Sequence, residues 1–134
     1  MRAAIIVADF NKEITQDMET AAINQLKKNK ITNISIIHVP GSFEVPFAAK
    51  QIIKKVDIIV ALGAVIQGDT HHDIILVDTI APALMELSLK HNKPIGFGII
   101  GPRVTEKQAK DRATDYAARA VKAALALQRI KNND

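Results

Sequence analysis

Four short apolar runs recur along the 134-residue chain, and a segment of helical character follows each one. The runs occupy residues 3–8, 34–39, 57–62 and 95–100. A continuous apolar run of this length is typical of a strand that is buried on both faces of a parallel sheet. Strand–helix alternation repeated four times predicts right-handed crossovers, with helices on both faces of the sheet. We therefore expect an α/β fold: a three-layer α-β-α sandwich around a four-stranded parallel sheet.

The expected winding is flavodoxin-like, and the helices have recognisable boundary signals. Thr15 is the expected N-cap of the first helix. The second is expected to begin at Pro46, which suits the first turn of a helix, and to run to about Ile53. The third follows His72 and contains Pro82, which predicts a kink there or a break just before it.

The last helical region begins with a clear signal. Thr105 and Gln108 match a capping box, in which each side chain satisfies a backbone donor of the other residue. The region is expected to run to about Arg129, with a break near residues 114–115. Residues 131–134 are expected to form a polar tail.

Length and composition exclude several classes of protein. The length predicts one domain over residues 1–134, and the absence of cysteine excludes disulfides, thiol catalysis and thiolate metal sites. No apolar run approaches the roughly 20 residues that span a bilayer, and no leader precedes the first strand, so we expect a cytoplasmic protein without membrane contact. The net charge of +4 arises from scattered lysines, and aromatic residues make up only 4%, so nucleic-acid binding is not expected.

The loop between the third strand and the next helix, residues 63–73, has the composition of an anion site. Backbone N–H groups at a helix N-terminus lack internal partners and bind anions. Gly68 lets the backbone approach a ligand closely, and Thr70 adds a hydroxyl donor. His72 is placed to pass a proton to or from a bound molecule. The helix dipole favours its neutral form and Asp69 favours its charged form, so the net direction stays open.

Ligands of open parallel sheets bind beyond the carboxyl ends of the strands. Three of the four phenylalanines follow strand ends or lie near them, namely Phe10, Phe43 and Phe97. Phe10 could stack on a planar heterocycle or equally cap the core. Glu44 could accept hydrogen bonds from a ligand or simply begin a helix.

Two arginines of the last helical region are candidates for anion binding. The guanidinium of Arg112 could clamp a phosphate, and Arg119 falls on nearly the same face. The alternative is that both are ordinary exposed helix residues. An aspartate at the end of the third strand would have indicated a phosphoacceptor receiver domain, but Asp57 begins that strand, so this reading is excluded.

The remaining histidines carry weaker signals. A metal site at residues 71–73 is disfavoured because consecutive side chains diverge and no further ligand cluster has metal spacing, so no metal is expected. His38 and His91 are interpreted as residues at a strand end and a helix end without a special role.

Segments spread over nearly the whole chain resemble the 6,7-dimethyl-8-ribityllumazine synthase family. They are Phe10-Asn11, Gly41-Ser42-Phe43-Glu44-Val45-Pro46, Gly63-Ala64-Val65-Ile66 with Gly68 to His72, Pro94-Ile95-Gly96-Phe97-Gly98, and Gln108 to Arg112. The resemblance implies condensation of 5-amino-6-(D-ribitylamino)uracil with 3,4-dihydroxy-2-butanone 4-phosphate, in riboflavin biosynthesis. It also implies that no metal or organic cofactor takes part.

The resemblance assigns roles to individual residues. Phe10 would stack on the pyrimidine, Ser42 and Glu44 would hold the ribityl chain, and His72 would relay protons. The remaining substrate contacts would involve Phe43, Val65, Ile66, Phe97 and Arg119. The phosphate would be bound by Gly68, Asp69, Thr70 and Arg112.

Phe97 and Arg112 would reach the site of a neighbouring subunit, so the resemblance implies a homo-oligomer, either a pentamer or a pentamer-based shell, with sites between subunits. Gln67 stands where the family commonly has arginine, and Asp69 where it commonly has a small residue. A non-catalytic flavin- or lumazine-binding or shell-forming protein on the same fold is the alternative. The related archaeal-type riboflavin synthase fits the Gly-Ser-Phe-Glu segment and the 68–72 loop less well.

Overall fold

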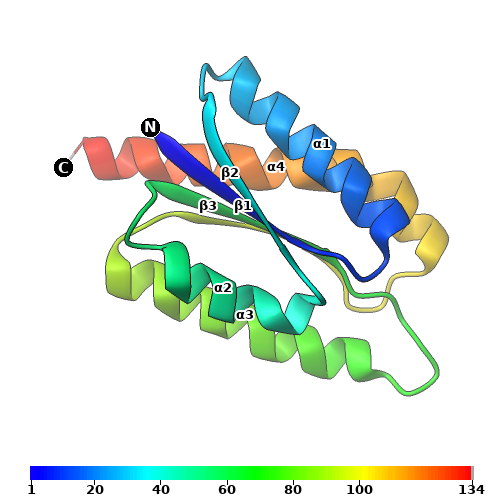
Figure 1. The fold of residues 1–134 in the computed structure, drawn as a ribbon. Helices are drawn as coiled ribbons and strands as arrows, with labels where there is room; N and C mark the ends of the chain where they lie inside the picture. The colour runs from blue at the N-terminus through cyan, green and yellow to red at the C-terminus, as the bar shows by residue number, and fades with distance from the viewer. Residues whose placement is uncertain (134) are drawn as a thin grey trace.

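The computed structural model of the protein describes residues 1–133, in which strands and helices alternate along the chain (Figure 1). In chain order the elements are β1 (Arg2–Ala8), α1 (Lys12–Lys28), β2 (Asn33–Val39), the 3-10 helix η1 (Ser42–Glu44), α2 (Val45–Ile52), β3 (Ile58–Ala64), α3 (His72–His91), β4 (Ile95–Ile100) and α4 (Glu106–Asn132).

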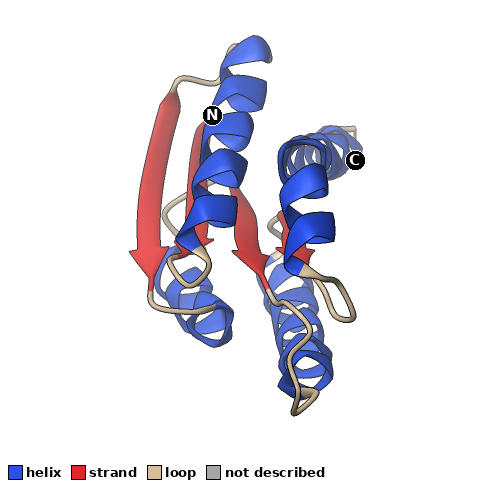
Figure 2. Ribbon diagram, turned by 90° about the vertical axis from the view of Figure 1, so that its right-hand side faces the viewer, coloured by secondary structure: helices blue, strands red, loops and turns tan. Residues whose placement is uncertain are grey.

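The four strands form one parallel sheet in the order β2-β1-β3-β4 (Figure 2). Ile5 of β1 lies opposite Ile36 of β2 and Val60 of β3. The chain first moves from β1 outward to β2 and then crosses to β3 on the other side of β1. The predicted flavodoxin-like winding is confirmed, and its switch point, where such sheets bind ligands, lies between the ends of β1 and β3.

Helices cover both faces of the sheet, with α1 and α4 on one side and α2 and α3 on the other (Figure 1). Ile5 and Val60 pack with Met18 of α1, whereas Ile6, the next residue of β1, packs with Ile80 of α3. Because central strands are buried on both faces, their sequences are unbroken apolar runs. Each fully buried isoleucine contributes roughly 1.5–3 kcal/mol to folding. The predicted three-layer sandwich is confirmed.

Helix α4 lies unusually close to β4, since two glycines of that strand face the helix. A Cβ at Gly96 would overlap the carbonyl group of Ala120, and a Cβ at Gly98 would lie 3.0 Å from the Ala120 side chain. Phe97, between these glycines, is half-buried at the edge of the sheet. The close packing of α4 against β4 therefore fixes the position of the Phe97 ring.

The expected N-cap of the first helix is wrong. Helix α1 begins at Lys12 with Asn11 as its N-cap, and Thr15 lies one turn inside the helix with its side chain buried. Asn11 has a left-handed backbone (φ 64°) and makes no side-chain capping bond. Its amide instead donates to the carbonyl oxygen of Ala64 at 2.8 Å. This long-range contact leaves no local capping pattern in the sequence.

No helix break is found at the two expected positions within the described residues, whereas the alternative of a kink at Pro82 stays a prediction. Helix α3 is continuous through Pro82, which is exposed, so water can satisfy the carbonyl group that loses its N–H partner. Helix α4 is continuous through residues 114–115, because the weak helix propensity of Thr and Asp costs less than about 0.7 kcal/mol each against a long packed face. It includes residues 131 and 132, which were expected in a polar tail; Lys131 donates to the carbonyl oxygen of Asn92 at 2.8 Å. The capping box of Thr105 and Gln108 is confirmed by reciprocal bonds of 3.0 and 3.1 Å.

Strand β3 lies slightly later in the chain than expected. Asp57 precedes it and accepts the backbone N–H of Arg2 at 2.6 Å, while Gly63 and Ala64 still pair with β4. The strand thus reaches two residues farther toward the candidate site. Across residues 1–133, none of the helices has both the length and the apolar character needed to cross a bilayer.

Candidate active site

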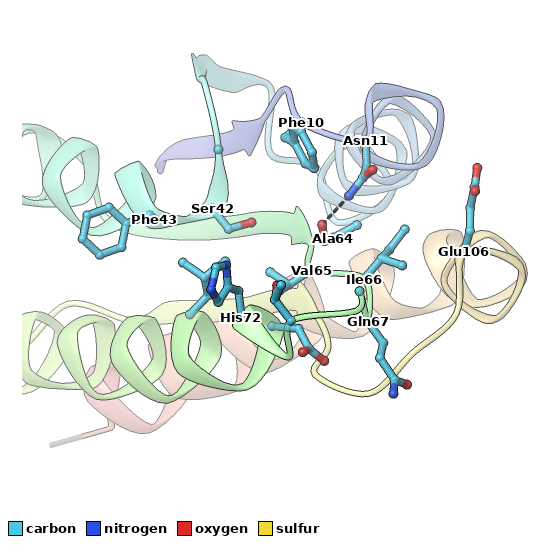
Figure 3. A pocket seen from close by; sticks show the side chains of 15 residues that line it. Phe10, Asn11, Ser42, Phe43, Ala64, Val65, Ile66, Gln67, His72 and Glu106 are labelled. Carbon is cyan, nitrogen blue, oxygen red and sulfur yellow. Dashed lines mark hydrogen bonds between the residues drawn. The ribbon is translucent and has the colours of Figure 1, made fainter.

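A cavity of about 570 Å³ lies at the switch point, beyond the carboxyl ends of β1 and β3 (Figure 3). Its wall is formed by the β1–α1 loop, η1, the end of β3 with the loop that follows it, and the first turns of α3 and α4. This volume is within the usual range for small-molecule sites. The predicted position of the site at this edge of the sheet agrees with the cavity.

The ring of Phe10 is the most prominent apolar group of the cavity, and 70% of the residue is exposed. Its backbone N–H donates to the carbonyl oxygen of Pro40 at 3.0 Å. The neighbouring Asn11 is tied to Ala64 across the mouth of the cavity (Figure 3). The ring therefore does not cap the core, and its planar face is free to stack on a ligand.

Ser42 and Phe43 reach the cavity from η1, directly after Gly41. Ser42 is buried, and its hydroxyl lies against β3, where a Cβ at Gly63 would overlap it. Phe43 is 60% exposed. The Glu44 carboxylate turns back to accept the Gly41 N–H at 2.8 Å and does not line the cavity. Within this chain, Glu44 thus stabilises the turn that contains Ser42 and Phe43.

The loop after β3 contains consecutive backbone N–H groups that have no acceptor among residues 1–133. Val65 and Gln67 are held by bonds of 2.8 Å from their N–H groups to the carbonyl oxygens of Ile100 and Val104. Beyond this point, the backbone N–H groups of residues 68–73 donate to no acceptor within residues 1–133. At the N-terminus of a helix, such groups together with the helix dipole favour an anion.

His72 is the first residue of α3, and its exposed imidazole points toward the cavity (Figure 3). The preceding residue, His71, has a left-handed backbone (φ 58°) and does not line the cavity. The turn at His71 directs the two adjacent histidines differently, so only His72 is available to a ligand. No group of three or more metal-ligating side chains within residues 1–133 could hold a metal ion.

Asp73 is a site residue to which the sequence assigned no role beyond the disfavoured metal site. It is 3% exposed, and its Oδ2 atom accepts the backbone N–H of Arg103 at 2.8 Å. Its Oδ1 atom is buried without a hydrogen-bond partner among the described residues. Arg103 is thirty residues away in the chain, so no local pattern could have revealed this contact. Asn11, Gln67 and Glu106 also line the cavity without a predicted role.

The structure brings together eight of the predicted site residues in this cavity. The apolar and backbone contributors are Phe10, Phe43, Val65, Ile66 and Gly68, and the polar ones are Ser42, Thr70 and His72. Asp69 is exposed on the same loop but lies outside the lining. No lysine or arginine of residues 1–133 lines the cavity, whereas Asp73 and Glu106 do.

The other predicted residues lie elsewhere on the protomer. Phe97 and Arg119 line a separate cavity of about 260 Å³ at the β4 edge, together with Tyr116. Arg112 is exposed on α4 and lines neither cavity. Within one chain, the aromatic and basic residues of β4 and α4 are therefore not part of the site that contains His72.

The family model of 6,7-dimethyl-8-ribityllumazine synthase matches residues 1–132. The chain belongs to the 6,7-dimethyl-8-ribityllumazine synthase family. A relative of this name from Metallosphaera sedula is 40% identical over 131 residues, which cover 96% of this chain and 87% of the relative. Another from Saccharolobus solfataricus is 41% identical over 137 aligned positions, covering 100% and 89%. One from Staphylothermus marinus is 43% identical over 124 residues, covering 91% and 83%.

Membership of the lumazine synthase family confirms the resemblance seen in the sequence. The parallel sheet, its winding and the histidine at the start of α3 are the features on which that resemblance depended. The structure adds that His72 and the end of β3 line one cavity at the switch point of the sheet.

Proposed function

We propose that this protein condenses 5-amino-6-(D-ribitylamino)uracil with 3,4-dihydroxy-2-butanone 4-phosphate to give 6,7-dimethyl-8-ribityllumazine, phosphate and water. The family membership of the chain supports this reaction. The observation that carries it is the cavity in which an exposed ring, Phe10, shares a wall with His72 and the open N-terminus of α3. A flat pyrimidine, a proton-transfer step and a phosphate each need one of these three features.

The pyrimidine is proposed to lie on the face of Phe10. Val65 and Ile66 would meet its polar edge through their backbone groups, as the end of β3 reaches the cavity there. Ser42 would bind a hydroxyl of the ribityl chain. Glu44 remains a candidate for binding the ribityl chain, but only through the carboxylate oxygen that does not accept the N–H of Gly41.

The phosphate is proposed to lie at the N-terminus of α3, against the free N–H groups from Gly68 onward and the hydroxyl of Thr70. The lining of the cavity includes the carboxylates of Asp73 and Glu106 and no lysine or arginine among residues 1–133. A dianionic phosphate would be repelled there unless a cation arrived from outside the protomer.

That cation is proposed to be Arg112 of a neighbouring subunit, with Phe97 and Arg119 completing the pyrimidine side of the same site. All three are exposed or half-buried, and none of them lines the cavity of its own chain. Large apolar residues on α2 and α3 are also exposed and would be covered in an assembly: Phe47, Ile75, Met85 and Leu89. We propose a pentamer or a pentamer-based shell that acts in the cytoplasm.

His72 is proposed to move protons in the successive steps. It would assist water loss during imine formation, protonate or deprotonate the chain during phosphate elimination, and assist water loss again at ring closure. No metal or organic cofactor is assigned a step. Most of the acceleration would come from holding two reactants in one orientation, which is worth up to roughly 7–11 kcal/mol.

The test is direct. Purified protein is mixed with the two substrates, and the fluorescence of the lumazine product is followed, with sedimentation of the same sample to measure the assembly. Product formation above the uncatalysed rate is expected. A protein that binds the lumazine but forms none from its precursors is a binding protein of the same fold, and the proposal is then wrong.

A further inference from the structure

A cluster of three ionisable side chains lies on the α1 side of the sheet, where β2 ends. Nδ1 of His38 is 2.8 Å from Oδ1 of Asp9, and Nε2 of His38 is 2.9 Å from Oε1 of Glu19. The side chains of Asp9 and His38 are about half exposed, at 48% and 46%, and that of Glu19 is 22% exposed. The ring thus joins the end of β2 to α1 and to the β1–α1 loop.

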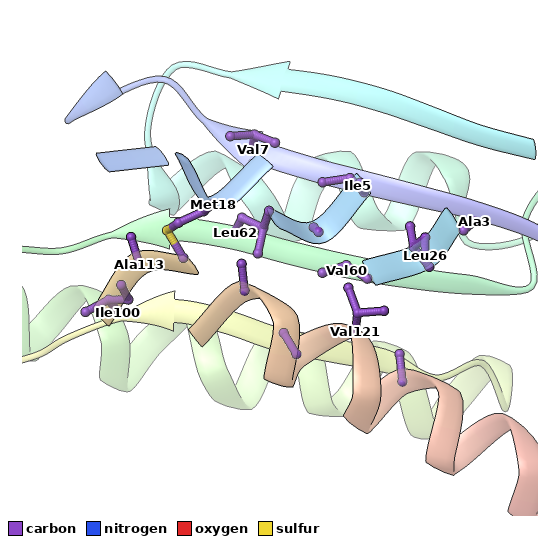
Figure 4. Close-up of a cluster of buried hydrophobic side chains, with 14 of the residues drawn as sticks. Ala3, Ile5, Val7, Met18, Leu26, Val60, Leu62, Ile100, Ala113 and Val121 are labelled. Atoms are coloured by element: carbon purple, nitrogen blue, oxygen red, sulfur yellow. The ribbon is translucent and has the colours of Figure 1, made fainter. Parts of the chain in front are cut away.

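The direction of each side chain follows from strand alternation. His38 lies opposite Val7 in the register of β2 and β1, and Val7 faces the buried cluster under α1 (Figure 4). Asp9 is two residues beyond Val7 and faces the same side, next to His38. Phe10, the next residue, lines the active-site cavity at the end of the sheet.

The ring of Phe10 has little of its own to hold it in place, because 70% of the residue is exposed. It is instead held through its two neighbours. Asn11 on one side is bound to the carbonyl oxygen of Ala64, and Asp9 on the other side is bound to His38. The backbone N–H groups of Asp9 and Phe10 continue the ladder to β2, with bonds to the carbonyl oxygens of Val39 and Pro40 of 2.8 and 3.0 Å.

The two ring nitrogens of His38 contact different segments of the chain. Nδ1 makes a hydrogen bond with Asp9, and Nε2 lies 2.9 Å from Oε1 of Glu19. Lys12 of α1 lines the same small cavity, together with the uncharged Thr15 and Gln16. The ring of His38 thus bridges an acidic residue of the β1–α1 loop and an acidic residue of α1.

We propose that His38 is a positioning residue for pyrimidine binding. By bridging Asp9 and Glu19, it fixes the β1–α1 loop and with it the plane of Phe10 against the substrate ring. This inference rests on the proposed function, since it assigns the ring of Phe10 to the pyrimidine. It differs from the interpretation of His38 as a strand-end residue without a special role.

Two substitutions of His38 separate its contact with Asp9 from its contact with Glu19. The amide nitrogen of Asn can occupy the place of Nδ1, so His38→Asn keeps the bond to Asp9 and loses the one to Glu19. The amide nitrogen of Gln can occupy the place of Nε2, so His38→Gln keeps the bond to Glu19 and loses the one to Asp9. Both variants replace the ring by an uncharged amide, which makes each the control of the other.

We expect His38→Gln to raise the KM for 5-amino-6-(D-ribitylamino)uracil about two- to fivefold, the range for a partly exposed ion pair. The KM for the butanone phosphate and kcat should stay at wild-type values, and His38→Asn should resemble the wild type in all three. A pyrimidine KM unchanged in His38→Gln, or raised equally in both variants, overturns the positioning role.

The substitutions lie on the surface, and thermal unfolding and sedimentation check that each variant is folded and assembled. Should His38→Gln fail to fold, Asp9→Ala against Asp9→Asn tests the same arm, since only the asparagine retains an oxygen that accepts from Nδ1. Asp9→Ala is then expected to give the pyrimidine effect, and an unchanged KM in it contradicts the inference.

Calorimetric titration with 5-amino-6-(D-ribitylamino)uracil separates this inference from the proposed function. If the wild type binds the pyrimidine but forms no lumazine, the proposed reaction is wrong, and the Kd ratio of the two His38 variants still decides the positioning role. If the wild type forms lumazine and both variants bind equally well, only the role of His38 is wrong.

Discussion

Asp73 accepts the backbone N–H of Arg103 at 2.8 Å, which ties the first turn of α3 to the loop before α4. The residue before Asp73 is His72, so this bond fixes the helix end that carries the proposed proton relay. The acceptor is 3% exposed, and the donor belongs to a residue with a left-handed backbone (φ 64°). The site is therefore held by a part-buried contact between segments thirty residues apart.

Removal of this carboxylate is expected to destabilise the protein. Asp73→Ala removes the part-buried bond to the N–H of Arg103, which costs about 1–3 kcal/mol in free energy of unfolding, measured by urea denaturation. Asp73→Asn retains an acceptor oxygen and should be clearly more stable than Asp73→Ala. Equal stability of the two variants would show that the bond to Arg103 contributes little.

His72 is expected to affect turnover rather than binding. His72→Ala should lower kcat about a hundredfold, the lower range for loss of a general acid–base group, while the KM values of both substrates change little. The matched control is His71→Asn, because asparagine tolerates the left-handed backbone of that residue and its side chain lies outside the cavity. A His72→Ala enzyme with normal turnover would remove this residue from the mechanism.

The fold could be predicted from the sequence because its main signals are local. Unbroken apolar runs such as residues 3–8 result from burial on both faces of the sheet, and the capping box of Thr105 and Gln108 needs only four residues. The N-cap of α1 could not be predicted, since the side chain of Asn11 is used for a bond to Ala64, 53 positions later.

The site was predictable only in part, for the same reason. Loop residues such as Gly68 and His72 follow directly from a strand–loop–helix pattern. The bond between Asp73 and Arg103 and the bridge at His38 join distant segments, and their residues have no distinctive spacing. Family patterns located Phe97 and implied that it reaches the site of a neighbouring subunit, and in the structure it lies outside the cavity of its own chain.

Arg112 is expected to act on the phosphate of a neighbouring subunit's substrate. Arg112→Ala should raise the KM for 3,4-dihydroxy-2-butanone 4-phosphate about tenfold or more, since a charge-assisted hydrogen bond contributes about 1.5–3 kcal/mol. The pyrimidine KM should change little. Lys110→Ala, an exposed residue of the same helix, is the control for a general loss of positive charge. If both substitutions raise the phosphate KM equally, Arg112 has no specific role.

Gly68 allows the anion-binding loop to be tested without disturbing the fold. A Cβ at Gly68 would meet no atom within 4 Å, so Gly68→Ala should leave the free energy of unfolding nearly unchanged. The added methyl group would instead stand between the backbone N–H groups and the phosphate. We expect the KM for the butanone phosphate to rise about tenfold, as for loss of one charge-assisted bond.

The matched substitution at the other glycine of this segment should behave in the opposite way. A Cβ at Gly63 would overlap the Ser42 hydroxyl, so Gly63→Ala should lower the free energy of unfolding by about 1–3 kcal/mol, as overpacking does. Urea denaturation and steady-state kinetics on both variants separate the two effects. A Gly68→Ala enzyme with an unchanged phosphate KM would show that the phosphate does not approach the backbone at this position, and the anion would then have to lie nearer the first turn of α3.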